Sequence, residues 1–282
     1  MKSRGFTLVE LVMVIMITGI LAATITVFLK PAIDSYFDTR RRADLTDMAD
    51  TALRRMGKDI RGAVPNSVRS VSGTCFQLVP TIAGGRYRMA SDTVNDTPLP
   101  LPCTPSATCS APLDVAQATT VFDVLSPMAT VPAQNDWVVI GNQNPNDVYA
   151  GINRGKISAA PTVPRSSDGL HRIAIDSTQF PVGYDGGRFV VVPEAGKTVI
   201  YSCVGNTLYR KVTTTFALAD DTACTGASDG AVVATDVANC TFVYDPNQGA
   251  TQQSGFVWMR IELSRSGESA ALAHGVHVDN VP

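Results

Sequence analysis

The chain has 282 residues, of which 45 % are hydrophobic and 17 % charged, and its formal net charge is −2. This composition makes a real hydrophobic core available. No basic stretch follows residue 62, which argues against a nucleic-acid-binding protein.

The N-terminus combines a short basic stretch with a long apolar one. The 24 residues from Phe6 to Leu29 contain one charge, Glu10, and the next charge is Lys30. As a helix at roughly 1.5 Å per residue they extend about 36 Å, enough to cross a bilayer core of about 30 Å with some tilt. A secretory signal peptide cleaved near Ala22 is the competing interpretation, but its apolar region is only about 7 to 15 residues long. We therefore predict a membrane-spanning helix over residues 6–30.

Glu10 is the informative residue in this span. A carboxylate at the centre of a membrane helix costs roughly 2.5 to 3.5 kcal/mol on insertion scales. The run Gly5-Phe6-Thr7-Leu8-Val9-Glu10, preceded by Lys2 and Arg4, resembles the start of a type IV prepilin. Prepilins are the precursors of subunits of type IV pili and type II secretion pseudopili. The alternative is a solvated Glu10 at the membrane edge.

The resemblance implies processing and a role for Glu10. In the family, a membrane-embedded prepilin peptidase cuts after the glycine, here between Gly5 and Phe6. It removes the leader of residues 1–5 and methylates the new amino terminus of Phe6. The Phe6 amine and the Glu10 carboxylate of a neighbouring subunit, each costly alone, then become acceptable as a pair that fixes axial register.

The resemblance also implies partners and a location. The expected partners are other major and minor pilins, the prepilin peptidase and the inner-membrane pilus assembly platform. The protein is expected to cross the inner membrane once, with a periplasmic head, and later to enter a pilus or pseudopilus fibre.

The helix is expected to continue beyond the membrane over residues 31–62. Pro31 should kink or restart it, because proline donates no backbone hydrogen bond. Gly62 and Pro65 should end it. Apolar residues recur at steps of three and four and predict one buried face: Leu45, Met48, Ala49, Ala52, Leu53, Met56 and Ile60. An ordinary membrane anchor that leads into a soluble domain would show the same pattern.

Residues 63–282 read as a β-rich head, so the predicted fold is α+β and pilin-like. We expect one or two antiparallel sheets with the long helix against one face. The predicted strands are 74–79, 119–125, 136–140, 171–176, 188–192, 198–203, 207–213, 240–244, 256–264 and 272–278. Gly205-Asn206 is the clearest hairpin turn.

Residues 80–135 differ in composition from the rest of the head. They hold 8 of the 17 prolines, including the cluster Pro98, Pro100, Pro102 and Pro105. We expect an irregular surface loop rather than core. Such an insertion would be either a contact surface or a passive loop.

The C-terminal half of the chain resembles one particular group within the prepilin family. Leu208-Tyr209-Arg210, the strand around Phe242 to Asp245 and a final long strand from Val257 to Leu263 are similar to the J-type minor pseudopilins. The run Ala52 to Ala63 and the cysteine-bearing loops are most similar to minor prepilins of the mannose-sensitive haemagglutinin (MSHA) pilus.

All six cysteines follow the predicted span: Cys75, Cys103, Cys109, Cys203, Cys224 and Cys240. An even number in a periplasmic domain predicts three disulfides rather than metal binding, since no Cys-x-x-Cys occurs. Three precede residue 110 and three follow residue 202, so at least one bond must join the groups. Cys103–Cys109 and one bond within the second group would be local, which leaves Cys75 for the third.

No catalytic motif is present. The sequence lacks Gly-x-Ser-x-Gly, His-Glu-x-x-His and a phosphate-binding glycine loop, so we expect no enzyme and no cofactor. His274 and His277 lie three apart in a predicted strand and should face opposite sides. Asp220, Asp221 and Asp229 in a loop are a weak calcium candidate, with ordinary turn aspartates as the alternative.

The leading hypothesis is a minor pilin of an MSHA-type pilus in the initiation or near-tip complex. The first alternative is a J-like minor pseudopilin of type II secretion. The second belongs to another class, a membrane-anchored adhesin or binding module that uses residues 80–135.

Overall fold

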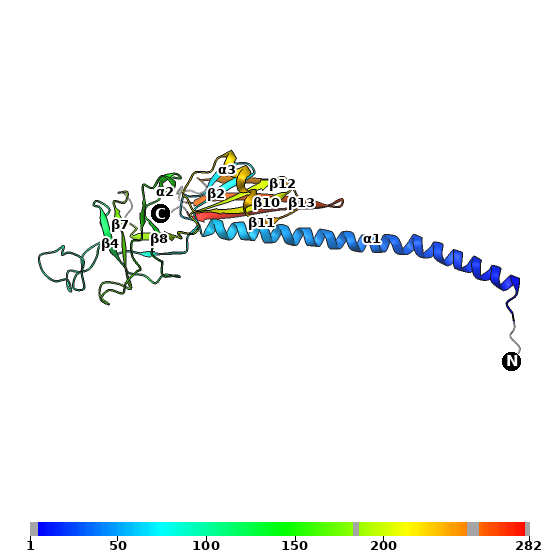
Figure 1. Ribbon diagram of the computed structural model, residues 1–282, viewed down its shortest axis with the longest axis horizontal. Coiled ribbons are helices and arrows are strands. Elements are labelled where there is room, and N and C mark those ends of the chain that lie inside the picture. The colour runs from blue at the N-terminus through cyan, green and yellow to red at the C-terminus, as the bar shows by residue number, and fades with distance from the viewer. Residues whose placement is uncertain (1–4, 183–185, 247–253, 280–282) are drawn as a thin grey trace.

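A computed structural model describes residues 5–182, 186–246 and 254–279. One long helix, α1, runs from Leu8 to Arg61 and carries the head at its C-terminal end (Figure 1). Pro31 was expected to kink the helix or restart it, and the restart is wrong, because α1 continues through that residue and curves gently along its length. A single proline removes one hydrogen bond, and the neighbouring turns hold the helix together. α1 ends where predicted, with Gly62 as its cap.

The head is built from short strands and has no second long helix among its described residues. The strands are β1 (Arg69–Ser72), β2 (Cys75–Leu78), β3 (Ala83–Arg86), β4 (Thr119–Val124), β5 (Trp137–Val139), β6 (Arg154–Lys156), β7 (His171–Thr178), β8 (Arg188–Val192), β9 (Thr198–Val204), β10 (Thr207–Thr213), β11 (Ala231–Ala234), β12 (Val237–Asp245), β13 (Ser254–Arg265) and β14 (Glu268–Asp279). Three short helical segments are α2 (Asp147–Ala150), α3 (Asp221–Thr225) and the 3-10 helix η1 (Gly226–Asp229). All ten predicted strands are present. The sequence did not predict β1, β3, β6 and β11, which have only three or four residues each.

The strands pair antiparallel, as predicted, but the expectation of one or two sheets is wrong. The described strands form four sheets. Near α1 lie a five-stranded sheet in the order β1-β2-β9-β10-β11 and a three-stranded sheet in the order β12-β13-β14. Beyond the C-terminal end of α1 lie a four-stranded sheet in the order β3-β8-β5-β6 and the pair β4-β7 (Figure 1). The described buried residues form two large hydrophobic cores, one beside α1 and one in the distal sheets, and two smaller clusters.

The first core joins α1 to the two sheets beside it. The helix contributes the buried residues Leu45, Ala49, Ala52, Leu53, Met56, Gly57 and Ile60, nearly the set expected from the three- and four-residue spacing. They pack against residues of β13 and β14 and of the five-stranded sheet, where Phe76 stacks on Tyr201 at 5.1 Å between ring centroids. The buried residues of α1 begin at Leu45, and the rest of the chain does not cover the apolar window that precedes them.

The second core corrects the expectation for residues 80–135. That segment contains β3 and β4, and its side chains Tyr87, Leu113, Phe122 and Val124 are buried. They pack against strands that follow later in the chain and form the distal core with them. The segment is irregular between these two strands, as its prolines suggest, but it is not a surface loop throughout.

A buried charged cluster fixes the irregular part of this segment. The Asp96 carboxylate accepts hydrogen bonds from the amide and the hydroxyl of Ser110 at 2.8 and 2.5 Å, and it pairs with Arg165 at 2.8 Å. Arg165 also pairs with the buried Asp168 at 2.8 Å. Burial raises the pKa of Asp96, but the hydrogen bonds from Ser110 and Arg165 outweigh it and place the pKa below the usual 3.8.

The structure confirms the prediction of three disulfides. Cys75 is bonded to Cys224, Cys103 to Cys109 and Cys203 to Cys240. The first bond joins β2 to α3, across 149 positions of the sequence. The third joins β9 to β12 and therefore links the two sheets beside α1.

A polar contact attaches α1 to the head beside the first core. Asp59 Oδ2 accepts hydrogen bonds from the Tyr201 hydroxyl at 2.8 Å and from Arg210 Nε at 2.7 Å. Arg210 is the last residue of the Leu-Tyr-Arg pattern in β10. Burial raises the pKa of Tyr201, and the neighbouring Asp59 charge raises it further, so this hydroxyl stays a donor.

Removal of the Asp59 carboxylate should destabilise the attachment of the helix. Asp59→Ala leaves a half-buried guanidinium and a hydroxyl without their acceptor, so we expect the free energy of unfolding in urea to fall by roughly 2 to 3 kcal/mol. The matched change on the same helix is Asp50→Ala, which breaks an exposed pair with Arg54. It should cost only about 0.5 kcal/mol or less. Equal losses in the two variants would contradict the role given to Asp59.

The Asp96 cluster should make the Pro-rich segment sensitive to acid. Because the folded pKa of Asp96 lies below 3.8, its stabilisation is present above that pH and is lost as the pH falls through the folded value. Hydrogen-exchange protection of residues 92–112 should therefore decline below about pH 3.8 in the natural chain. In Asp96→Asn it should already be roughly 10- to 100-fold lower at pH 7. Asp114→Asn, at an exposed position in the same region, should change neither; unaltered protection in Asp96→Asn would rule the cluster out as the cause.

Candidate functional site

Glu10 lies in the first turn of α1 and forms a capping box with Thr7. The Glu10 amide donates to Thr7 Oγ1 at 3.3 Å, while the Thr7 amide and hydroxyl donate to Glu10 Oε2 at 2.9 and 3.0 Å. This arrangement satisfies amides that have no partner at a helix N-terminus. Thr7 was not among the residues predicted from the sequence, although the Thr-x-x-Glu spacing is the ordinary signal for such a cap.

The cap uses only one of the two carboxylate oxygens. Among the residues that the structure describes, no donor reaches Glu10 Oε1, and the side chain is exposed. The negative charge stands at the positive end of the helix dipole, where a carboxylate is favourably placed. A subunit on its own therefore holds Glu10 in a fixed orientation with one oxygen open to a further donor.

The peptide bond between Gly5 and Phe6 precedes the helix. Residues 5–7 have no helical structure, and the Phe6 side chain is 85 % exposed. A Cβ atom built at Gly5 would meet no other described atom within 4 Å. Lys2 and Arg4 lie outside the described residues.

The apolar part of α1 suits a hydrocarbon environment. The helix is long and apolar enough to cross a membrane, and the side chains of its apolar window are not buried by the rest of the chain. The hydroxyls of Thr18, Thr24 and Thr26 donate to the carbonyl oxygens of Val14, Ile20 and Ala22 at 2.7, 2.7 and 2.8 Å. Each hydroxyl is thus satisfied within the helix, as a lipid-exposed segment demands.

The lower edge of the head contacts α1 soon after this apolar part. Arg42 donates to Glu268 at the β13–β14 turn, with an Nη2–Oε2 distance of 2.8 Å. Arg41 pairs with Asp38 one turn earlier on the helix. Three consecutive arginines, Arg40, Arg41 and Arg42, follow the apolar span, and Arg42 is the one that holds the head to α1.

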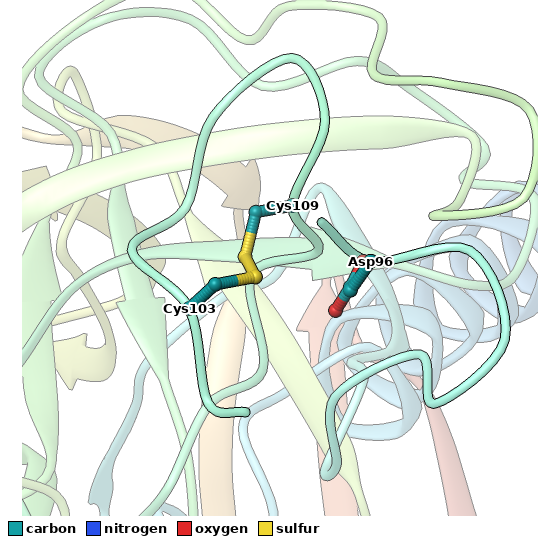
Figure 2. Close-up of side chains that lie close together, drawn as sticks. All are labelled: Asp96, Cys103 and Cys109. Atoms are coloured by element: carbon teal, nitrogen blue, oxygen red, sulfur yellow. A yellow bond between two sulfur atoms is a disulfide. The ribbon is translucent and has the colours of Figure 1, made fainter. Parts of the chain in front are cut away.

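One group of possible metal ligands occurs among the described residues, and it does not fit a metal. Asp96, Cys103 and Cys109 have ligand atoms within 4.8 Å of one another (Figure 2). The two sulfur atoms are bonded to each other, so no thiolate is available. The Asp96 oxygens already accept hydrogen bonds from Ser110 and Arg165. The group is a structural junction of the Pro-rich segment.

The two histidines of β14 do not form a metal pair. His274 faces α1, where its Nε2 would lie 3.3 Å from a Cβ atom built at Gly57. His277 lies on the opposite side against Phe256, with 5.1 Å between ring centroids. The expectation that they face opposite sides is confirmed.

The loop aspartates have structural partners. Asp220 caps α3 by accepting from the Ala223 amide at 2.8 Å, and Asp229 pairs with Lys211 at 2.9 Å. They do not form a metal-ligand group with Asp221 among the described residues. The arrangement favours ordinary turn aspartates over a calcium site.

Comparison with known proteins bears on the N-terminus. The family model described as "Prokaryotic N-terminal methylation motif" matches residues 1–26. Comparison with curated proteins and with solved structures finds no match to the chain. The matched segment covers the leader, Phe6, Glu10 and most of the apolar span. Together with the long helix and the β-rich antiparallel head, this motif supports a type IV pilin or pseudopilin.

Proposed function

We propose that this chain is a minor pilin of an MSHA-type type IV pilus, similar to the minor prepilin MshO. It acts as a structural subunit of the initiation or near-tip complex. The observation that carries the proposal is the start of α1, where an exposed scissile bond, a capped carboxylate and an unburied apolar span follow one another within the matched motif.

Processing follows from this arrangement. A prepilin peptidase reaches the Gly5–Phe6 bond in the extended segment before the helix. Cleavage leaves a cationic amine on Phe6, which the peptidase methylates. The amine then stands one helical turn from Glu10, at the end of an apolar helix in an array of similar helices.

The pair between subunits draws its specificity from the cost of mismatch. An amine and a carboxylate that both enter an apolar array are expensive unless each finds its partner. The open Oε1 of Glu10 supplies an acceptor for the amine of the neighbouring subunit. One register along the fibre satisfies both charges, so the pair selects that register.

The presence of Glu10 also bears on position in the fibre. In the J-type family the subunit at the extreme tip typically lacks this glutamate, since no subunit lies above it. A chain that keeps Glu10 has a carboxylate for the amine of a subunit above. We therefore place it below the tip.

The C-terminal pattern supports the J-type part of the proposal. Leu208 is buried in the first core, and Arg210 binds Asp59 of α1. Two residues of the J-type pattern thus serve to hold α1 against the head.

Processing should define the N-terminus of the mature protein. From cells with an active prepilin peptidase, the intact mass should correspond to a chain that starts at monomethylated Phe6. From cells without it, the mass should correspond to a start at Met1. A mature start near Thr24 would indicate signal-peptide cleavage and would overturn the proposal.

The charge of Glu10 should matter for assembly separately from its cap. Glu10→Gln keeps a side chain that still accepts from the Thr7 amide, but it cannot neutralise an amine. We expect this variant to be processed and inserted normally, and its amount in sheared surface fibres, measured by immunoblot, to fall at least about 10-fold, the effect of one unpaired charge worth 1.4 kcal/mol or more.

Thr7→Val is the matched control. It removes the hydroxyl of the cap, which is worth about 1 kcal/mol, and it leaves the charge in place. It should enter fibres at nearly the natural level. If Glu10→Gln assembles as well as Thr7→Val, the pairing hypothesis is wrong. A defect in exoprotein release without any change in surface fibres would instead favour the type II secretion pseudopilin.

A further inference from the structure

A cavity lies where the residues that follow α1 meet one face of the four-stranded sheet. It has a volume of about 440 Å³, within the range of roughly 300 to 1,000 Å³ usual for small-molecule sites. Val64 and Pro65, just after α1, line one side, and Val139 and Val190 line the sheet side. β8, which carries part of the lining, lies beyond the C-terminal end of the helix (Figure 1). The cavity is therefore remote from the assembly segment.

Two arginines on neighbouring strands also line this cavity. Arg86 of β3 and Arg188 of β8 are directly opposite partners in the antiparallel register. Opposite residues have Cβ atoms about 4.5 to 5.5 Å apart and share a face of the sheet, and like charges in such a pair are destabilising. Within the described part of the chain, no acidic side chain lines the cavity and neither arginine has an ion-pair partner.

Gly84 keeps one wall of the cavity free of a side chain. It is two residues from Arg86 on the same strand, so a side chain there would project into the same space. A Cβ atom at Gly84 would lie 3.0 Å from the Phe189 carbonyl oxygen, whereas one at the next residue, Gly85, would point to the other face of the sheet, 2.8 Å from Ser126 Oγ. The strand therefore approaches its neighbours closely and leaves an apolar space beside two positive charges.

We propose that this cavity binds a small anionic amphiphile, a molecule with one carboxylate or phosphate on an apolar body. The paired guanidinium groups of Arg86 and Arg188 offer planar donors that match either anion bidentately. The apolar lining takes the body of the molecule. Both arginines are exposed, so their side chains are accessible to an anion that enters the cavity from solvent. This binding is independent of the proposed role in fibre assembly.

The test uses the full-length protein in detergent micelles and isothermal titration, with heats from empty micelles subtracted. The probes are 2-naphthoate, 2-naphthyl phosphate and the neutral 2-naphthamide. We expect saturable one-to-one binding of at least one anion, at least 10-fold tighter than that of the amide. The stronger of the two anions identifies the headgroup.

Variants assign the binding to the arginine pair. Arg86→Gln with Arg188→Gln should weaken anion binding at least 10-fold, whereas Arg86→Lys with Arg188→Lys should retain part of the affinity. Arg40→Gln with Arg55→Gln, which removes two exposed charges from α1, should bind as the natural chain does. Circular dichroism checks that each variant is folded.

Three results would overturn the proposal. They are the absence of saturable binding to the natural chain, equal affinity for the anions and the amide, and undiminished binding in the double glutamine variant. If the glutamine variant does not fold, the comparison of charged and neutral probes on the natural chain decides alone.

Discussion

The packing of the upper half of α1 against β14 is the contact on which the rest of the molecule depends. A Cβ atom at Gly57 would lie 3.2 Å from Val276 Cγ2, so the helix lies as close to the strand as a residue without a side chain allows. Asp59 adds a polar bond to Arg210 beside this apolar seam. Because α1 is one continuous helix, the contacts that fix its C-terminal half against the head also fix the direction in which its apolar half extends from the head. The head and the first turn of the helix therefore form one mechanical unit.

Many elements of this fold could be predicted from local sequence patterns, but the division of the head into four sheets could not. The longer strands, such as Thr207–Thr213, have enough residues of high β-propensity between turn signals to be recognised. Short strands such as Ala83–Arg86, half of it glycine, carry no such signal. The proline content of residues 80–135 correctly indicated irregular backbone but concealed its burial. That burial depends on packing against strands that follow later in the chain. The pair that fixes its irregular part, Asp96 with Arg165, likewise joins residues 69 positions apart, and no local pattern reports contacts of that kind.

The candidate site shows the same division between local motif and long-range role. Glu10 stood out because a lone charge in an apolar span is expensive. Gly5 and Phe6 were identified by the resemblance of the N-terminus to type IV prepilins, and neither inference needs a structure. The role of Thr7 as a helix cap could have been predicted from its spacing to Glu10. The cap matters because it gives the Glu10 carboxylate hydrogen-bond partners within its own subunit. In a free subunit the carboxylate is stabilised by its own helix end, and only one oxygen is open. From the sequence, Arg210 was recognisable only as part of the Leu-Tyr-Arg pattern. The structure shows that it binds Asp59 of α1.

The first core holds α1, whereas the second core belongs to the distal sheets and does not contribute to the packing of the helix. Among the strands, α1 packs against β11, β13 and β14, all of which belong to the first core. The distal sheets join this part through a cluster in which Arg154 lies 3.9 Å above the Phe216 ring and Phe216 meets Trp137 edge to face. Changes in the distal core can therefore alter the far end of the subunit without disturbing the seam that orients the stalk. The arginine-lined cavity lies at the boundary, with one wall from the residues that follow α1 and the other from the distal sheet. That is where a bound molecule would contact both parts of the head at once.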